Sequence, residues 1–183
     1  MVVAGIAALA VVVVLASARG GSDTPAASGP QDVTTRIELI SAGGSAVGDV
    51  APAFEARTTA GTAFALPAGK PAVLFFMASW CATCVPEAAA LEAIRADVGD
   101  RVDILGVSAD PTDSLTTIRD FAEQAGARYG FVHDGDGSLA QALGVRSLDT
   151  TVIIDAAGRV VWRDSVPTDE ETLRDALAQV GAA

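Results

Sequence analysis

Cysteine, histidine, lysine and the aromatic residues are all scarce in this chain. Its 183 residues contain two cysteines (Cys81 and Cys84), one histidine (His133) and one lysine (Lys70). Because neither cysteine precedes residue 81, we expect no lipid anchor on an N-terminal cysteine. Aromatic residues make up only 5% of the sequence. The core must therefore be built largely from Ala, Val, Leu and Ile.

Positive charge is scarce as well. Twelve Lys and Arg residues stand against 23 Asp and Glu residues, which gives a formal net charge of -11 and a pI near 4.3. Proteins that bind nucleic acid need a basic face to neutralise phosphates. The composition therefore excludes nucleic acid as a partner, and we interpret the acidic surface as a source of solubility.

Residues 1–18 are almost entirely Val, Ala, Leu and Ile. The run is slightly short for a membrane span and has a length compatible with the apolar core of a signal peptide. Ala16-Ser17-Ala18 has the small-x-small form of a cleavage site, although no Lys or Arg precedes the run. We expect residues 1–18 to be a signal peptide or a membrane anchor, and the protein to be extracytoplasmic, either membrane-anchored or secreted.

The next residues mark the boundary of a folded domain. Residues 19–45 include a stretch rich in Gly, Ser and Pro, and we expect them to form a flexible linker and lead-in. Residues 46–183 are enough for a single domain with its own hydrophobic core. The sequence thus predicts one folded domain behind a tether.

Strand and helix patterns alternate along this domain. The continuous apolar run 72–78 predicts a central strand covered on both faces. The turn at Gly61 predicts a hairpin of two short strands that precedes this run. The remaining predicted elements are helix 81–98, strand 101–108, helix 113–125, strand 131–133, a short helix 138–143 with Ser138 as its N-cap, a hairpin of 150–154 and 159–162, and helix 168–180. This order predicts an α/β sandwich with a mixed sheet.

Both cysteines lie where a predicted strand gives way to a predicted helix, in Trp80-Cys81-Ala82-Thr83-Cys84. Residues three apart share one face of a helix, so the two sulfurs can close a disulfide without moving the backbone. A helix N-terminus also favours a thiolate. We therefore predict that Cys81 is the exposed catalytic nucleophile and that Cys84, one turn inside the helix, is the shielded resolving thiol.

Three blocks follow one another along the domain: Gly48-Asp49-x-Ala51-Pro52-x-Phe54, Trp80-Cys81-x-x-Cys84-x-x-Glu87, and Gly144-Val145-x-x-x-x-Thr150-Thr151-x-x-Ile154-Asp155 followed by Gly158. Over about residues 46–180 the chain resembles the thioredoxin superfamily, specifically the TlpA/ResA-like extracytoplasmic thiol-disulfide oxidoreductases. The resemblance implies a thioredoxin-like three-layer sandwich, with a central mixed sheet, helices on both faces and an inserted helix-strand unit over residues 113–131.

The same resemblance implies an enzyme that exchanges disulfides with protein thiols or disulfides, and that works as a monomer without a cofactor.

 It also implies a reductive role, with a membrane electron donor that recharges the cysteine pair. Two alternatives remain open: a disulfide-forming oxidant, and a redox-inactive or copper-handling binding domain on the same fold. Copper-handling relatives combine a cysteine pair with a distant histidine, for which only His133 is available here. Two thiols and one imidazole leave a tetrahedral ion short of a ligand, so we expect no metal site.

Three further residues of these blocks are candidates for supporting roles. Trp80 either lines the site as an apolar wall or is an ordinary core tryptophan. Glu87 lies where the family carries a buried acid near its cysteines, which would handle protons during exchange; alternatively it is an exposed acid in the first turn of the helix. Thr150 opens the Thr-Thr pair of the terminal hairpin, directly after the position at which the family places a cis-proline.

Asp149 occupies that proline position. A cis bond before a non-proline residue costs about 2.5–4 kcal/mol, so we expect the loop 147–149 to be trans or strained. The carboxylate either faces the sulfurs or points to solvent. If it faces them, its charge disfavours the thiolate, raises the pKa of Cys81 and favours the disulfide over the dithiol. We hypothesise on this basis that Asp149 makes the Cys81–Cys84 couple more reducing.

Overall fold

The computed structural model describes residues 35–181. The predicted signal peptide or anchor, residues 1–18, lies outside the described residues. Within the part that is described, no helix is both long enough and apolar enough to cross a membrane. Strand β1, Arg36–Leu39, falls inside the range 19–45 that we expected to be linker and lead-in. Regular structure therefore begins earlier than residue 46.

A small antiparallel sheet opens the described chain, in the order β1-β2-β3. Strands β2, Phe54–Arg57, and β3, Ala63–Leu66, form the predicted hairpin. Gly61 in the connecting turn has a φ of 80°, a left-handed conformation that glycine adopts without steric cost. Strand β1 pairs with the other edge of β2 and continues this sheet by one strand.

The second sheet is mixed and has the order β6-β5-β4-β7-β8. Its central strand β4, Ala72–Met77, is buried at all six residues, as the unbroken apolar run predicts. Strand β5, Asp103–Ser108, runs parallel to β4, whereas β7, Thr150–Ile154, runs antiparallel to it. The edges are β6, Gly130–His133, and β8, Val160–Arg163, and the terminal hairpin of β7 and β8 is confirmed.

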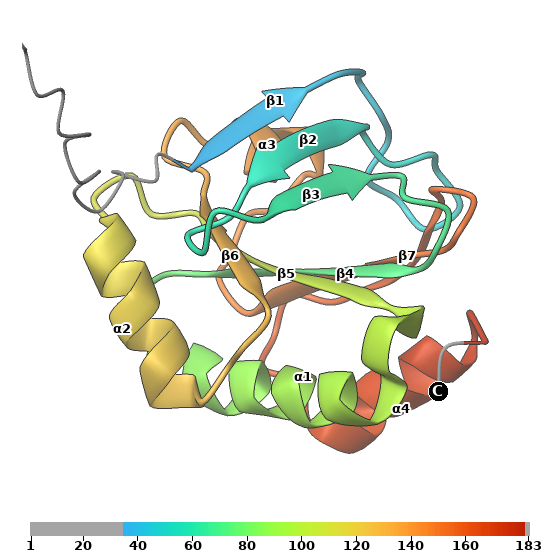
Figure 1. The fold of residues 1–183 in the computed structure, drawn as a ribbon. Helices are drawn as coiled ribbons and strands as arrows, with labels where there is room; N and C mark the ends of the chain where they lie inside the picture. Colours follow the sequence, from blue (N-terminus) through green and yellow to red (C-terminus); the bar gives the residue numbers. More distant parts are fainter. Residues whose placement is uncertain (1–34, 182–183) are drawn as a thin grey trace, which may run out of the picture. The chain divides into compact units, whose positions relative to one another are not determined.

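Both faces of this sheet are covered (Figure 1). Helices α1, Cys84–Val98, α2, Leu115–Ala125, and α4, Glu170–Ala178, pack on one face. Helix α3, Ser138–Ala142, and the three-stranded sheet pack on the other. Alternate side chains of β4 enter the two core clusters, because successive residues of a strand point to opposite faces: Val73, Phe75 and Met77 face α1, and Leu74 and Phe76 face the small sheet. The three-layer sandwich is confirmed.

Helix α3 begins differently from the prediction. Its N-cap is Gly137, with a φ of 69°, and Ser138 is the first helical residue. The carboxylate of Asp134 accepts hydrogen bonds from the backbone N–H groups of Leu139, at 3.1 Å, and Ala140, at 2.8 Å. A side chain from the preceding loop thus satisfies the free donors of the helix, and the prediction of Ser138 as N-cap was wrong.

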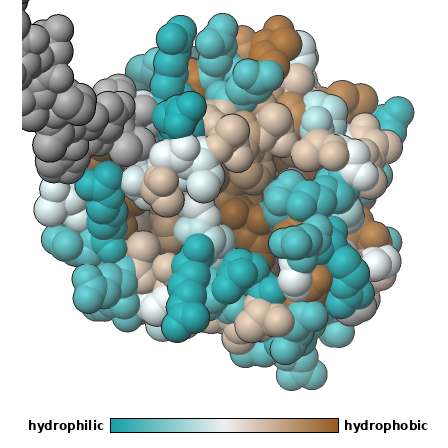
Figure 2. Space-filling model, in the orientation of Figure 1, coloured by the Kyte–Doolittle hydropathy of each residue, from teal (hydrophilic) through white to brown (hydrophobic). Residues whose placement is uncertain are grey.

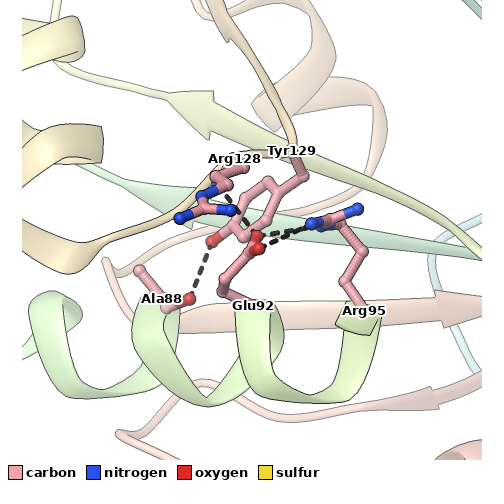
Figure 3. Close-up of polar contacts among 5 residues, drawn as sticks. All are labelled: Ala88, Glu92, Arg95, Arg128 and Tyr129. Atoms are coloured by element: carbon pink, nitrogen blue, oxygen red, sulfur yellow. Dashed lines mark hydrogen bonds and ion pairs between the residues drawn. The ribbon is translucent and has the colours of Figure 1, made fainter. Parts of the chain in front are cut away.

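A group of polar contacts fastens α1 to the segment before β6 (Figure 3). The Tyr129 hydroxyl donates to the carbonyl oxygen of Ala88 at 3.3 Å, and the backbone N–H of Arg128 donates to Glu92 at 2.9 Å. Glu92 also forms an ion pair with Arg95, whose hydrogen bonds hold the pKa of Glu92 below its usual value. Burial raises the pKa of Tyr129, so it remains a neutral donor. These contacts fix α1 against the edge of the sheet.

Apolar residues remain visible on the face shown in Figure 2, where they lie in patches among hydrophilic side chains. The largest exposed apolar side chain among the described residues near the cysteines is Trp80, which is 67% exposed. Trp80 is followed directly by Cys81, so it lies beside the cysteine pair at the end of β4.

Candidate redox site

Cys81 and Cys84 form a disulfide, with their Cα atoms 5.3 Å apart. Cys81 is 6% exposed and Cys84 is fully buried. Helix α1 begins at Cys84, so the prediction that it begins at Cys81 was wrong. Cys81 lies in the preceding turn, where its N–H donates to Ala78 and its carbonyl accepts from the N–H of Cys84. Cys81 is therefore the more accessible of the two cysteines, but it is buried, and the prediction that it is exposed was wrong.

The loop between β5 and α2 holds the turn in front of the disulfide. The Asp113 carboxylate accepts three hydrogen bonds: from the N–H of Ser79 at 2.8 Å, from the Ser79 hydroxyl at 2.5 Å, and from the Ser108 hydroxyl at 2.5 Å. Sequence reasoning missed Asp113. The signal that points to it is topological: β4 and β5 are parallel neighbours, so the segments after their carboxyl ends meet at one edge of the sheet.

Trp80 stands on the surface beside this loop. Its indole N–H donates to the Asp110 carboxylate at 2.5 Å, and this bond is the main reason that the pKa of Asp110 lies below its usual value. The interpretation of Trp80 as a core tryptophan was wrong. His133 places Nε2 2.9 Å from the carbonyl oxygen of Asp110. Among the described residues, it does not belong to the one group of side chains close enough to share a metal ion.

Asp149 reaches the disulfide directly. It is 5% exposed, and its Oδ2 lies 3.8 Å from the Cys81 sulfur and accepts a hydrogen bond from the Thr83 hydroxyl at 2.6 Å. The alternative in which Asp149 points to solvent was wrong. Within residues 35–181 it is the only non-glycine residue with a positive φ, 53°, and its peptide bond is trans. The expected trans loop is thus accommodated by a left-handed conformation that Asp tolerates better than most residues.

The other oxygen of Asp149 has no partner. In the described part of the chain, Oδ1 is the one buried side-chain polar atom that lacks a hydrogen bond. A buried, unpaired carboxylate oxygen costs free energy, so it normally marks a ligand, an ion or a functional constraint. The position next to the disulfide makes this atom part of the site.

Thr150, the next residue, has a positional role. Its hydroxyl donates to the carbonyl oxygen of Ser147 at 2.8 Å and lies 3.2 Å from the Ser165 hydroxyl. The first contact closes the loop that carries Asp149, and the second ties this loop to the segment after β8. The side chain of Thr150 therefore supports the loop around the site.

Glu87 is buried in the first turn of α1, at 1% exposure. It accepts a hydrogen bond from the Thr151 hydroxyl at 2.6 Å and another from the N–H of Thr168 at 3.0 Å. Burial raises its pKa to about 7, despite these two hydrogen bonds. The alternative of an exposed first-turn acid was wrong, and Glu87 changes its charge near neutral pH.

A third acid joins Glu87 and Asp149 and was missed from the sequence. Asp164 follows β8, accepts from the N–H of Thr151 at 3.2 Å and from the Thr168 hydroxyl, and has a pKa raised chiefly by burial. The charges of Asp164 and Asp149 both act to raise the pKa of Glu87. Helix α1, the loop before β7 and the segment after β8 thus bring three carboxyl groups close enough to interact electrostatically.

A disulfide at a strand-to-helix turn, on a mixed sheet flanked by helices, defines a thioredoxin-like protein. Comparison with known families agrees: the Redoxin family model matches residues 46–180, and the chain belongs to this family. The matched residues include the five-stranded sheet, strands β2 and β3, helices α1 to α4 and the cysteine pair, whereas β1 lies outside them.

Similar proteins include the mercury resistance operon ORF3 protein of Streptomyces lividans, 32% identical over 126 residues that cover 66% of each chain. The thiol-disulfide oxidoreductase ResA of Bacillus thuringiensis is 26% identical over 113 residues, 61% of this chain and 64% of that protein. The chain thus spans slightly less than two thirds of these relatives. A secreted Mycobacterium tuberculosis disulfide oxidoreductase has a TM-score of 0.60 at 25% identity, over 69% of this chain and 95% of that one.

Proposed function

We propose that this protein is an extracytoplasmic thiol-disulfide oxidoreductase that works through Cys81 and Cys84, in the reducing direction. The observation that carries the proposal is the disulfide itself, with one slightly exposed and one fully buried sulfur at the start of α1. The family, and relatives named as thiol-disulfide and disulfide oxidoreductases, support the same reaction.

The reaction proceeds in two exchanges. In the reduced protein, the Cys81 thiolate attacks one sulfur of a partner disulfide, forms a mixed disulfide and releases the other partner sulfur as a thiolate. The Cys84 thiolate then attacks the Cys81 sulfur, which breaks the mixed disulfide and releases the second partner thiolate. The products are a reduced partner and the Cys81–Cys84 disulfide. An external electron donor, which we place in the membrane, returns the pair to the dithiol.

The surrounding residues take three roles in this scheme. Trp80 offers an exposed apolar surface, held by Asp110, against which a protein partner can dock beside Cys81. Glu87 takes up and returns the protons that exchange requires, because its pKa of about 7 lets it do both at neutral pH. Asp149 opposes ionisation of Cys81 and so favours the disulfide form.

The extracytoplasmic location is supported by the apolar run at residues 1–18 and by the likeness to a secreted oxidoreductase. Disulfide chemistry of this kind operates on proteins outside the reducing cytosol. We propose that the protein acts there as a monomer on cysteine pairs of other proteins.

Trapping the mixed disulfide tests this scheme. Reduced Cys84→Ser protein should form a stable covalent adduct with a peptide disulfide, because Cys81 attacks and no thiol remains to resolve the product. Reduced Cys81→Ser protein should form far less adduct, since Cys84 is fully buried. Wild-type protein should reduce insulin, and both variants should lose this activity. Insulin reduction by Cys81→Ser at the wild-type rate would contradict the proposal.

A further inference from the structure

Two sulfurs and one carboxylate converge at the site. One ligand atom from each of Cys81, Cys84 and Asp149 lies within 4.8 Å of the other two, and all three residues are buried. We propose that the reduced protein binds one borderline divalent metal ion, of which Zn²⁺ is the type, through these three side chains. This metal site lies beyond the thiol exchange proposed above.

The geometry matches a tetrahedral ion. Zn–S bonds of about 2.3 Å and Zn–O bonds of about 2.1 Å place ligand atoms roughly 3.6–3.8 Å apart around a tetrahedron. Oδ2 of Asp149 already lies 3.8 Å from the Cys81 sulfur. Once the disulfide is reduced, the two sulfurs can separate to a similar distance. Two thiolates and a carboxylate fill three positions, and water fills the fourth.

Asp149 is the second, independent observation that points to a ligand. Its Oδ1 is buried and lacks a hydrogen-bond partner within the described residues, although the side chain is 95% covered. The residue has a left-handed backbone conformation, and Oδ2 of its carboxylate lies 3.8 Å from the Cys81 sulfur. A cation bound at this carboxylate would offset the cost of burying an oxygen that the protein leaves unpaired.

The negative charge of these side chains also favours a divalent cation at the site. Two thiolates and the Asp149 carboxylate would place three negative charges in a buried space, beside the acids Glu87 and Asp164. A divalent cation offsets most of that repulsion. Thiolate ligands select Zn²⁺ over hard ions such as Mg²⁺ and Ca²⁺, which prefer oxygen ligands.

Binding depends on the oxidation state of the pair. In the dithiol form, two S–H bonds break, two protons pass to solvent, and two S–metal bonds and one O–metal bond form without any change of oxidation state. In the disulfide form each sulfur is bonded to the other and supplies no thiolate. Reduction of the disulfide by the electron donor of the exchange reaction therefore also frees the two sulfurs to bind the metal. A bound ion in turn protects the thiols from oxidation.

Zn²⁺ titration of the reduced and oxidised protein, against a chromophoric chelator, tests the site. The reduced wild type should take up one equivalent and the oxidised protein none. Asp149→Asn keeps the size and the tolerance for a left-handed backbone but is a poor zinc ligand, so its affinity should fall by at least about tenfold. Co²⁺ in place of Zn²⁺ should give thiolate-to-metal charge-transfer absorption in the reduced wild type.

Two controls separate ligation from a general loss of negative charge. Asp120→Asn, at an exposed position on α2, should retain wild-type affinity. Asp164→Asn removes a neighbouring acid that supplies no ligand and should change affinity much less than Asp149→Asn. No uptake of Zn²⁺ by the reduced wild type, or equal affinity in Asp149→Asn, would overturn the proposal. Mixed-disulfide trapping with Cys84→Ser is independent of metal, so either proposal can fail alone.

Discussion

Asp149 brings a carboxylate to 3.8 Å from the sulfur that we propose as the nucleophile. A negative charge at that distance opposes formation of a thiolate, and a thiol can also donate a hydrogen bond to it. We therefore expect the reduced protein to form the Cys81 thiolate less readily, and to attack partners more slowly, than the start of a helix would otherwise allow.

Removing that charge should activate Cys81. In reduced, metal-free Asp149→Asn the pKa of the Cys81 thiol should fall, and alkylation by iodoacetamide at pH 7 should become faster, on the order of tenfold for each unit of pKa. The pH dependence of the alkylation rate measures both quantities. Asp120→Asn serves as the control for a lost surface charge. An unchanged alkylation profile in Asp149→Asn would show that the carboxylate does not tune the thiol.

Glu87 makes stability depend on pH in a defined direction. Its pKa rises from 4.5 to about 7 in the folded protein, so the folded state retains a proton that the unfolded state has lost. The stabilisation that protonated Glu87 gives to the folded state is fully present below pH 4.5 and is lost as the pH rises to about 7. At about 1.4 kcal/mol per unit, the loss is about 3 kcal/mol.

Glu87→Gln should abolish that loss. Between pH 4 and pH 8, the free energy of unfolding of the wild type should fall relative to the variant by about 3 kcal/mol, as measured by urea denaturation of the oxidised proteins. Glu171→Gln, an exposed position in α4, should track the wild type. Parallel curves for the wild type and Glu87→Gln would mean that folding does not raise the pKa of Glu87.

At the scale of elements, the loop after β5 acts on the turn after β4. Asp113→Ala should leave the Ser79 N–H and the hydroxyl groups of Ser79 and Ser108 without their acceptor, and should cost about 3 kcal/mol of folding free energy. Urea denaturation gives this value, with Asp120→Ala, at an exposed position on α2, as the control. A cost equal to that of Asp120→Ala would show that the loop does not hold the turn.

The elements that could be predicted from the sequence are those with strong local patterns. The apolar run of β4, the hairpin of β7 and β8 and the helix ending at Gly126 follow from hydrophobic periodicity and glycine. The start of α1 was predicted three residues early: Cys81 lies in a turn before the helix, and Thr83, the N-cap residue, turns its hydroxyl to Asp149 rather than capping the helix. A contact over 66 residues of sequence leaves no local trace.

The site was predicted in the same uneven way. Cys81 and Cys84 were found from their spacing, but the burial of Glu87 and Asp149 depends on packing between distant segments. Asp113 and Asp164 belong to loops whose composition resembles that of ordinary exposed turns. Their roles follow only from which strands are neighbours in the sheet.

For the whole molecule, charge should govern the choice of substrate. The net charge is -11, Asp149 lies 3.8 Å from the Cys81 sulfur, and Asp110 contacts the neighbouring Trp80. Reduced protein should react faster with cystamine, a cationic disulfide, than with neutral hydroxyethyl disulfide, and the ratio should fall as salt is added. Stopped-flow thiol exchange at two ionic strengths measures the ratio. Equal rates at low salt would contradict an electrostatic preference.

The reduction potential of the Cys81–Cys84 couple tests the central claim most directly. Equilibration of the metal-free protein with defined mixtures of reduced and oxidised dithiothreitol or glutathione, followed by alkylation of the free thiols, gives its value. We predict a reversible two-electron couple with a reduction potential near the thioredoxin value of about -270 mV, as a reductant requires. A value near about -120 mV, typical of a strong disulfide-forming oxidant, or a pair that does not equilibrate at all, would contradict this account.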